Sequence, residues 1–158
     1  MLLARKLLTL AAVGSALVAV SAATAAAPRV DSLTGAEIIP VSSVRGTFVG
    51  YAKGDLPAVW RATILHRALS TGPSVAVTGG SFTILPTSGS TLRGTVTGGS
   101  VTVANPGRGC TNQSYRVSVT LSIGSFDGTL THYRHSLFGQ CLVYAATISG
   151  RGVFSVST

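Results

Sequence analysis

The run of residues 131–135, Thr-His-Tyr-Arg-His, carries the densest group of side chains that could do chemistry. In a β-strand, His132 and Arg134 share one face with Leu130, whereas Tyr133 lies on the opposite face. If the leucine points into a core, an imidazole and a guanidinium point inward with it. Such a pair would favour an anion and would include a group that titrates near neutral pH.

A second segment adds an indole and another imidazole. As a strand, residues 59–69 place Trp60, Ile64 and His66 on one face. We therefore predict a ligand-binding pocket inside the fold, formed by these residues: His66, His132, Arg134, Trp60 and Tyr133. Two alternatives stay open. Either the tyrosine packs inside while its histidine and arginine neighbours are solvated, or the polar side chains form a hydrogen-bonded structural network.

The sequence contains no conventional catalytic grouping, and we predict no catalytic residue, cofactor or metal ion. The four acidic residues are Asp31, Glu37, Asp55 and Asp127. The last two stand beside glycine, as turn residues do. No carboxylate pair at short spacing indicates glycoside hydrolysis, and no G-x-S-x-G motif is present. His132 and His135 would lie on opposite faces of a strand, which disfavours a shared metal ion.

The first 25 residues have the three-part pattern of a helical secretory signal peptide. Arg5 and Lys6 precede an apolar stretch, and Ala23 and Ala25 are the small residues before the preferred cleavage site. An uncleaved anchor is the alternative, but the apolar run is shorter than the ~20 residues that a span needs. We expect residues 1–25 to be removed, the mature protein to be secreted, and no transmembrane span to remain.

Cys110 and Cys141 are the two cysteines of the chain. In an exported protein such a pair predicts one disulfide. Free thiols or half of a metal site are the alternatives, but the sequence has no CxxC and no histidine at metal-ligand spacing from either cysteine. The chain-entropy model assigns roughly 3–4 kcal/mol to closing a loop of about 30 residues.

Beyond residue 45 the sequence is rich in strand-favouring residues separated by glycine-containing turns. The clearest segment is 113–123, where Tyr115, Val117 and Val119 alternate with polar residues and predict one buried face. Further strands are expected over 46–51, 59–69, 74–85, 91–104, 127–135, 141–148 and 152–156. Residues 59–69 also partly fit a helix, but the surrounding β-segments favour a strand.

About eight strands joined by short turns predict an all-β fold, a single antiparallel up-and-down β-barrel, with a β-sandwich as the alternative. The expected division is a signal peptide at 1–25, a lead-in segment at 26–44 and the barrel domain at 45–158. Residues 77–84 and 96–103 both contain Gly-Gly-Ser. Paired glycine bends at matching heights would let the sheet curl and close.

The charge balance is basic, with 12 Lys and Arg against 4 acids, a net charge of +8. Removal of Arg5 and Lys6 lowers this to +6 (8 − 2). The remaining basic residues are scattered, whereas a nucleic-acid binder more often clusters them among aromatics. We therefore expect no specific nucleic-acid partner. Attraction to an anionic cell-envelope polymer is the charge-driven alternative.

Several segments carry a family resemblance: Gly79-Gly80-Ser81-Phe82, residues 109–115, residues 130–134 and Gly139-Gln140-Cys141. In these segments the chain resembles small exported β-proteins of high-GC bacteria, for which the resemblance implies no activity. The layout is more distantly similar to the allene oxide cyclase and dirigent barrels. No catalytic residue of those families can be matched to this sequence, so none is carried over.

Three functions follow as hypotheses. The first is a binding module for a small apolar or anionic ligand, which requires a cavity of roughly a few hundred Å³ lined by His66, His132 and Arg134. The second is a structural or surface-interaction protein of the cell envelope. The third is a cyclase- or isomerase-like enzyme, an analogy that rests on fold alone. Whether the barrel is hollow best separates the first from the others.

Overall fold

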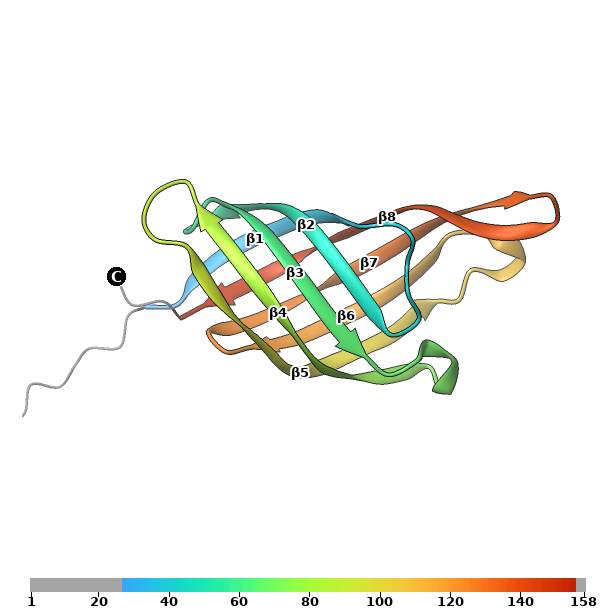
Figure 1. Cartoon of the computed structure of the whole chain (residues 1–158), viewed down its shortest axis with the longest axis horizontal. Coiled ribbons are helices and arrows are strands. Elements are labelled where there is room, and N and C mark those ends of the chain that lie inside the picture. The colour runs from blue at the N-terminus through green and yellow to red at the C-terminus, as the bar shows by residue number, and fades with distance from the viewer. Residues whose placement is uncertain (1–26, 156–158) are drawn as a thin grey trace, which may run out of the picture.

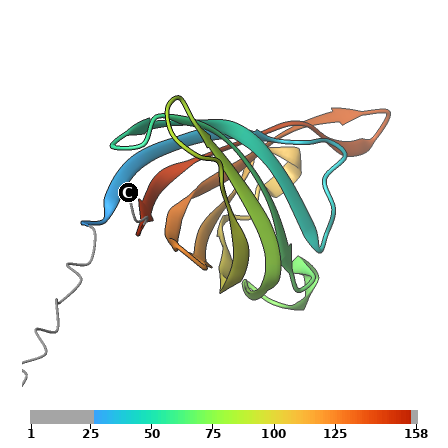
Figure 2. The same ribbon diagram turned by 60° about the vertical axis from the view of Figure 1, so that its left-hand side comes forward.

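The computed structural model describes residues 27–155, which form a closed barrel of eight antiparallel strands (Figures 1 and 2). The strands are β1 (Arg29–Glu37), β2 (Arg45–Gly54), β3 (Ala58–His66), β4 (Ser74–Pro86), β5 (Leu92–Asn105), β6 (Gln113–Leu121), β7 (Gly124–Leu137) and β8 (Gln140–Phe154). The predicted all-β fold and up-and-down barrel are confirmed. The expected signal peptide lies outside the described residues.

The barrel closes because β1 pairs with strands on both of its sides. Gly35 lies opposite Gly50 of β2 and opposite Ile148 of β8. Every strand therefore has two hydrogen-bonded neighbours, and the sheet has no free edge. Alternate side chains point into the barrel, as β6 illustrates with buried Tyr115, Val117 and Val119.

Two features differ from the sequence prediction. Residues 26–44, expected to be a lead-in segment, contain β1, so the barrel begins at Arg29 and not at residue 45. The inward positions of β1 include Asp31 and Glu37, and acidic residues at buried positions conceal the apolar alternation that marks a strand. The segments expected at 141–148 and 152–156 instead form one strand, β8, which continues through its glycines.

Aromatic rings occupy the space above several inward-facing glycines. A Cβ added to Gly35 would lie 2.7 Å from the Trp60 ring, and one added to Gly50 would lie 2.8 Å from it. A Cβ added to Gly128 or Gly150 would in the same way collide with the Phe126 ring. The rings take the volume that side chains at these glycines would need, and this packing carries β8 through residues that weaken a strand.

The two Gly-Gly pairs lie at the same height on β4 and β5. Residue pairing between these strands is interrupted between Ala76–Ser100 and Ser81–Thr95, where both glycine pairs fall. Gly80 and Gly99 have φ angles of 141° and 130°, which side chains rarely adopt. The paired bends predicted from the sequence repeat are therefore present.

The predicted disulfide is also present. Cys110 and Cys141 are bonded, with their Cα atoms 5.5 Å apart. Cys110 belongs to a short 3-10 turn, η2 (Arg108–Cys110), and Cys141 lies near the start of β8. The bond ties the β5–β6 connection to the β7–β8 hairpin, which projects beyond the barrel in Figure 1. A disulfide is typical of proteins from oxidising compartments.

Candidate functional site

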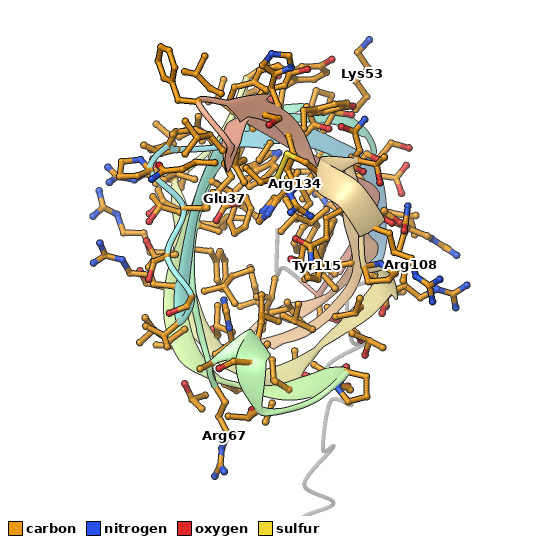
Figure 3. All side chains as sticks on the ribbon, turned by 90° about the vertical axis from the view of Figure 1, so that its right-hand side faces the viewer. Glu37, Lys53, Arg67, Arg108, Tyr115 and Arg134 are labelled. Carbon is orange, nitrogen blue, oxygen red and sulfur yellow. A yellow bond between two sulfur atoms is a disulfide. The ribbon has the colours of Figure 1, made fainter. Side chains whose placement is uncertain are left out.

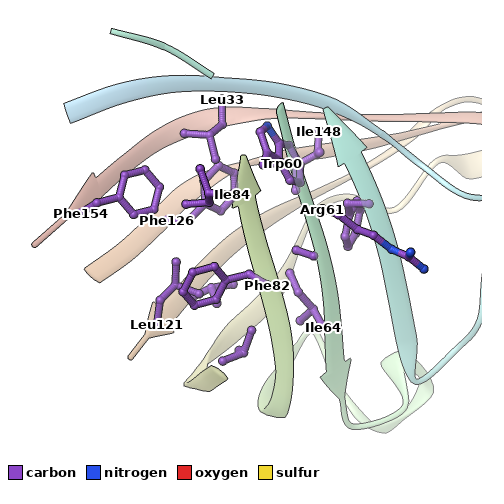
Figure 4. A pocket seen from close by; sticks show the side chains of 14 residues that line it. Leu33, Trp60, Arg61, Ile64, Phe82, Ile84, Leu121, Phe126, Ile148 and Phe154 are labelled. Carbon is purple, nitrogen blue, oxygen red and sulfur yellow. The ribbon is translucent and has the colours of Figure 1, made fainter. Parts of the chain in front are cut away.

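The barrel encloses an apolar cavity of about 50 Å³ (Figure 4). Its wall consists of aliphatic and aromatic side chains from all eight strands, together with Arg61, whose charged end points away from the other lining residues in Figure 4. The remaining lining residues are Leu33, Phe48, Trp60, Ala62, Ile64, Phe82, Ile84, Val96, Val119, Leu121, Phe126, Ile148 and Phe154. Such a lining favours an apolar guest.

Trp60 is the single tryptophan of the chain and forms part of this wall. Trp60 is 6% exposed. Its indole Nε1 is buried and has no hydrogen-bond partner among residues 27–155. A buried donor without an acceptor costs free energy. An oxygen atom of a bound molecule could accept that hydrogen bond.

A polar cluster fills the end of the barrel nearest the projecting hairpin. His132 Nε2 lies 2.9 Å from Glu37 Oε2, and the two side chains are 9% and 4% exposed. The ring of Tyr115 meets the His132 ring edge-on, with centroids 5.2 Å apart. Burial raises the pKa of Tyr115 above its ordinary value of 10.0, the positive charge of Arg134 lowers it, and the charge of Glu37 raises it further.

These residues surround a second, smaller pocket of about 20 Å³. Its lining combines the polar cluster with apolar residues and comprises Glu37, Ser42, Gly46, Phe48, Ile64, His66, Leu69, Val101, Tyr115, Val117, Leu130 and His132. Phe48 and Ile64 line both this pocket and the apolar cavity. The two spaces are therefore neighbours along the barrel, and these two side chains form a shared wall.

The five residues predicted for the ligand site are only partly brought together. His66 and His132 line the smaller pocket, and Trp60 lines the apolar cavity. Arg134 donates from Nη1 to the carbonyl of Gly107 at 3.1 Å, so it braces a loop. Tyr133 packs beside Tyr144, on the face of β7 opposite the buried His132.

Sequence reasoning gave no role to the two acids of β1. Glu37 completes the polar cluster, and Asp31 accepts a hydrogen bond from the Leu56 amide at 2.8 Å through Oδ1. Asp31 is 1% exposed, and its Oδ2 has no partner among residues 27–155. Their spacing in the sequence could have indicated that both acids face the interior, because Asp31, Leu33 and Glu37 share one face of an extended segment.

Burial of these two acids leaves the outside of the barrel strongly basic. Among residues 27–155 the exposed acids are Asp55 and Asp127. The exposed basic residues are Arg45, Lys53, Arg61, Arg67, Arg93, Arg108, Arg116 and Arg151. These exposed side chains leave the described exterior with a balance of +6 (8 − 2), enough to attract an anionic partner.

Within residues 27–155, no group of three or more His, Cys, Asp or Glu side chains is placed to hold a metal ion. No helix in that range is long and apolar enough to cross a membrane. Comparison with protein-family models, curated proteins and solved structures finds no match to this chain.

Proposed function

We propose that the barrel binds a small, elongated, mainly apolar molecule with one polar end. The observation that carries the proposal is the adjacency of the two interior pockets, which share Phe48 and Ile64. An apolar body would occupy the cavity beside Trp60, and a polar group would reach the pocket beside His132. Rotation of the two shared side chains would join the two spaces.

The polar end is expected to be uncharged. The anion-binding hypothesis relied on His132 and Arg134, but the first already pairs with Glu37 and the second with the Gly107 carbonyl. A second anion beside the Glu37 carboxylate would be repelled. A hydroxyl or carbonyl group avoids this repulsion, and a hydroxyl could both donate and accept hydrogen bonds.

The cavity volumes limit the size of the guest. Pockets for drug-sized ligands measure roughly 300–1,000 Å³, whereas these spaces measure about 50 and 20 Å³. The guest is therefore a short chain and not a ring, because even benzene occupies a cavity of about 150 Å³. Apolar burial of such a molecule contributes about 0.8 kcal/mol for each methylene group.

The single tryptophan offers a direct test. Titration with 1-hexanol, a neutral probe with an apolar chain, should change the fluorescence of Trp60 in a saturable manner. Ala62→Leu adds volume to the cavity wall and should abolish the saturable change. Val59→Leu is the matched control, because Val59 lies on the same strand but is 61% exposed. A linear response that is equal in all three proteins would refute the proposal.

We also propose that the protein is exported, with residues 1–25 acting as its signal peptide. The disulfide supports this placement, because such bonds persist in oxidising compartments. Mass determination of the protein recovered from the medium of a secreting host tests it. A mass that still includes residues 1–25, or retention inside the cell, would contradict it.

Envelope binding is a second candidate, favoured by the burial of Asp31 and Glu37 inside a basic exterior. In this function the barrel would adhere to an anionic polymer such as a polyphosphate-containing wall component. Binding to immobilised teichoic acid should fall steeply with added salt, because screening shortens charge interactions to about 3 Å at 1 M. Binding that is unchanged at that salt concentration would exclude a charge-driven function.

A further inference from the structure

We infer that the hairpin end of the barrel docks onto an anionic lipid surface, with the turn of the β7–β8 hairpin entering the boundary between headgroups and acyl chains. This inference goes beyond ligand binding and does not depend on it. Figure 3 looks onto this end of the molecule.

The hairpin presents exposed apolar side chains. Leu137 is 48% exposed, Phe138 97% and Leu142 45%. The connection between β1 and β2, at the same end, adds Ile38 at 47% and Val44 at 46%. Large apolar side chains exposed on two connections at one end of the barrel favour an interaction surface there.

The backbone at the tip is unusual for the residue that occupies it. Leu137 pairs with Gln140, so Phe138 and Gly139 form a two-residue hairpin turn. Their φ angles are +50° and +76°, as a type I′ turn requires. Asparagine, aspartate and glycine are the usual residues there, and a bulky side chain in this region is an outlier. Folding alone does not explain a phenylalanine, whereas insertion of its ring into lipid does.

The hairpin is braced against bending. The Cys110–Cys141 disulfide ties the hairpin to the β5–β6 connection close to its turn, since Cys141 pairs with Ser136. Arg134 adds a hydrogen bond from Nη1 to the Gly107 carbonyl and one from its amide to Asn112 Oδ1, at 3.1 and 3.3 Å. A braced tip loses little conformational freedom on docking, which favours binding.

The charges at this end identify the partner. Exposed Arg45 begins β2, Arg67 follows β3, and Arg108 lies in the β5–β6 connection, all at the hairpin end. The acid at this end, Glu37, is buried against His132. Each arginine near an anionic leaflet contributes about 1 kcal/mol. A second copy of the chain would instead bring like charges together, which disfavours self-association through this surface.

Vesicle co-sedimentation tests the inference. The chain from Ala26 onward is suitable, because its eight strands close on one another without residues 1–25. We expect it to sediment with vesicles of equal parts phosphatidylcholine and phosphatidylglycerol, and far less with phosphatidylcholine alone. Phe138→Ser should weaken the partition about tenfold, by loss of the apolar burial of one ring. Tyr51→Ser is the matched control, since Tyr51 is a 51% exposed aromatic on β2, away from the hairpin.

Circular dichroism establishes that each variant is folded before the comparison. Equal partition of wild type and Phe138→Ser would overturn the inference, as would failure of the folded wild type to bind the anionic vesicles. Sedimentation equilibrium tests the alternative occupant of this surface, which is a second copy of the chain. A dimer that Phe138→Ser dissociates would mean that the hairpin covers a second copy, and the lipid assignment would be wrong.

Discussion

His132 and Glu37 are 95 positions apart in the chain, yet their side chains lie 2.9 Å apart, Nε2 to Oε2, inside the barrel. Glu37 ends β1 and His132 belongs to β7, and β8 lies between these strands. The pair therefore joins two strands that share no backbone pairing. With Asp31, these two residues are the buried polar or charged side chains of the described interior.

Removal of one partner should be costly. Glu37→Ala would leave the buried His132 ring without its hydrogen-bond partner, and such losses cost about 1–3 kcal/mol. Chemical denaturation followed by circular dichroism measures the change in the free energy of unfolding. Asp127→Ala, at an exposed position, is the control and should stay within about 0.5 kcal/mol of wild type.

The double substitution Glu37→Leu with His132→Leu tests whether the loss in Glu37→Ala comes from leaving one polar group unpaired. Apolar replacement of both partners is often neutral or stabilising, so the double variant should be more stable than Glu37→Ala. If Glu37→Ala unfolds at the same denaturant concentration as wild type, the pair does not stabilise the fold.

The disulfide should stabilise one region more than another. Replacement of Cys110 and Cys141 by serine should lower stability by roughly 2–4 kcal/mol. Amide hydrogen exchange should accelerate in the β7–β8 hairpin more than in β4 and β5, because only the hairpin tip is tied by the bond. Quantitative alkylation of both thiols in the native protein, before any reductant is added, would defeat this prediction.

Alkaline pH should destabilise the fold through Tyr115. Its raised pKa means that the folded chain holds the phenolic proton more tightly than the unfolded chain does. The contribution of this group is complete below pH ~10 and is lost as the pH rises from there through the folded pKa. Tyr115→Phe removes the dependence, so its stability should fall less between about pH 9 and 11 than that of wild type. Parallel losses in both proteins would contradict the assignment.

The ring of Trp60 should exclude side chains at its neighbouring glycines. Gly35→Ala would place a Cβ 2.5 Å from the Val49 carbonyl oxygen and 2.7 Å from the indole, and we expect a loss of about 1–3 kcal/mol. Gly98→Ala is the control, because a Cβ there meets nothing within 4 Å. Thermal unfolding compares the two, and equal melting temperatures would show that the indole does not pack as described.

Much of the architecture could be predicted from local patterns. The alternation at Tyr115, Val117 and Val119 locates β6, and the pair of cysteines indicates the disulfide. The first strand was missed because Asp31 and Glu37 face the interior. Their burial depends on the Leu56 amide and on His132, contacts between distant parts of the chain.

The sequence predicted that the candidate site lies inside the barrel, but it did not identify all of the residues that form the site. Strand alternation correctly places His132 and Trp60 inside the barrel. The register of β7 against β8 shifts between Tyr133 and Arg134, and such irregularities redirect side chains. Arg134 consequently braces the β5–β6 connection. The alternation of residues along the strand does not predict this contact.

Methyl NMR spectroscopy during a titration with 1-hexanol tests the central claim, that the barrel interior binds a small apolar molecule. We predict saturable shifts at Ile84, Ile148 and Val96, which line the cavity, and none at exposed Val59 and Leu85. Shifts confined to the exposed methyl groups, or no saturable shift at the lining residues, would contradict the claim.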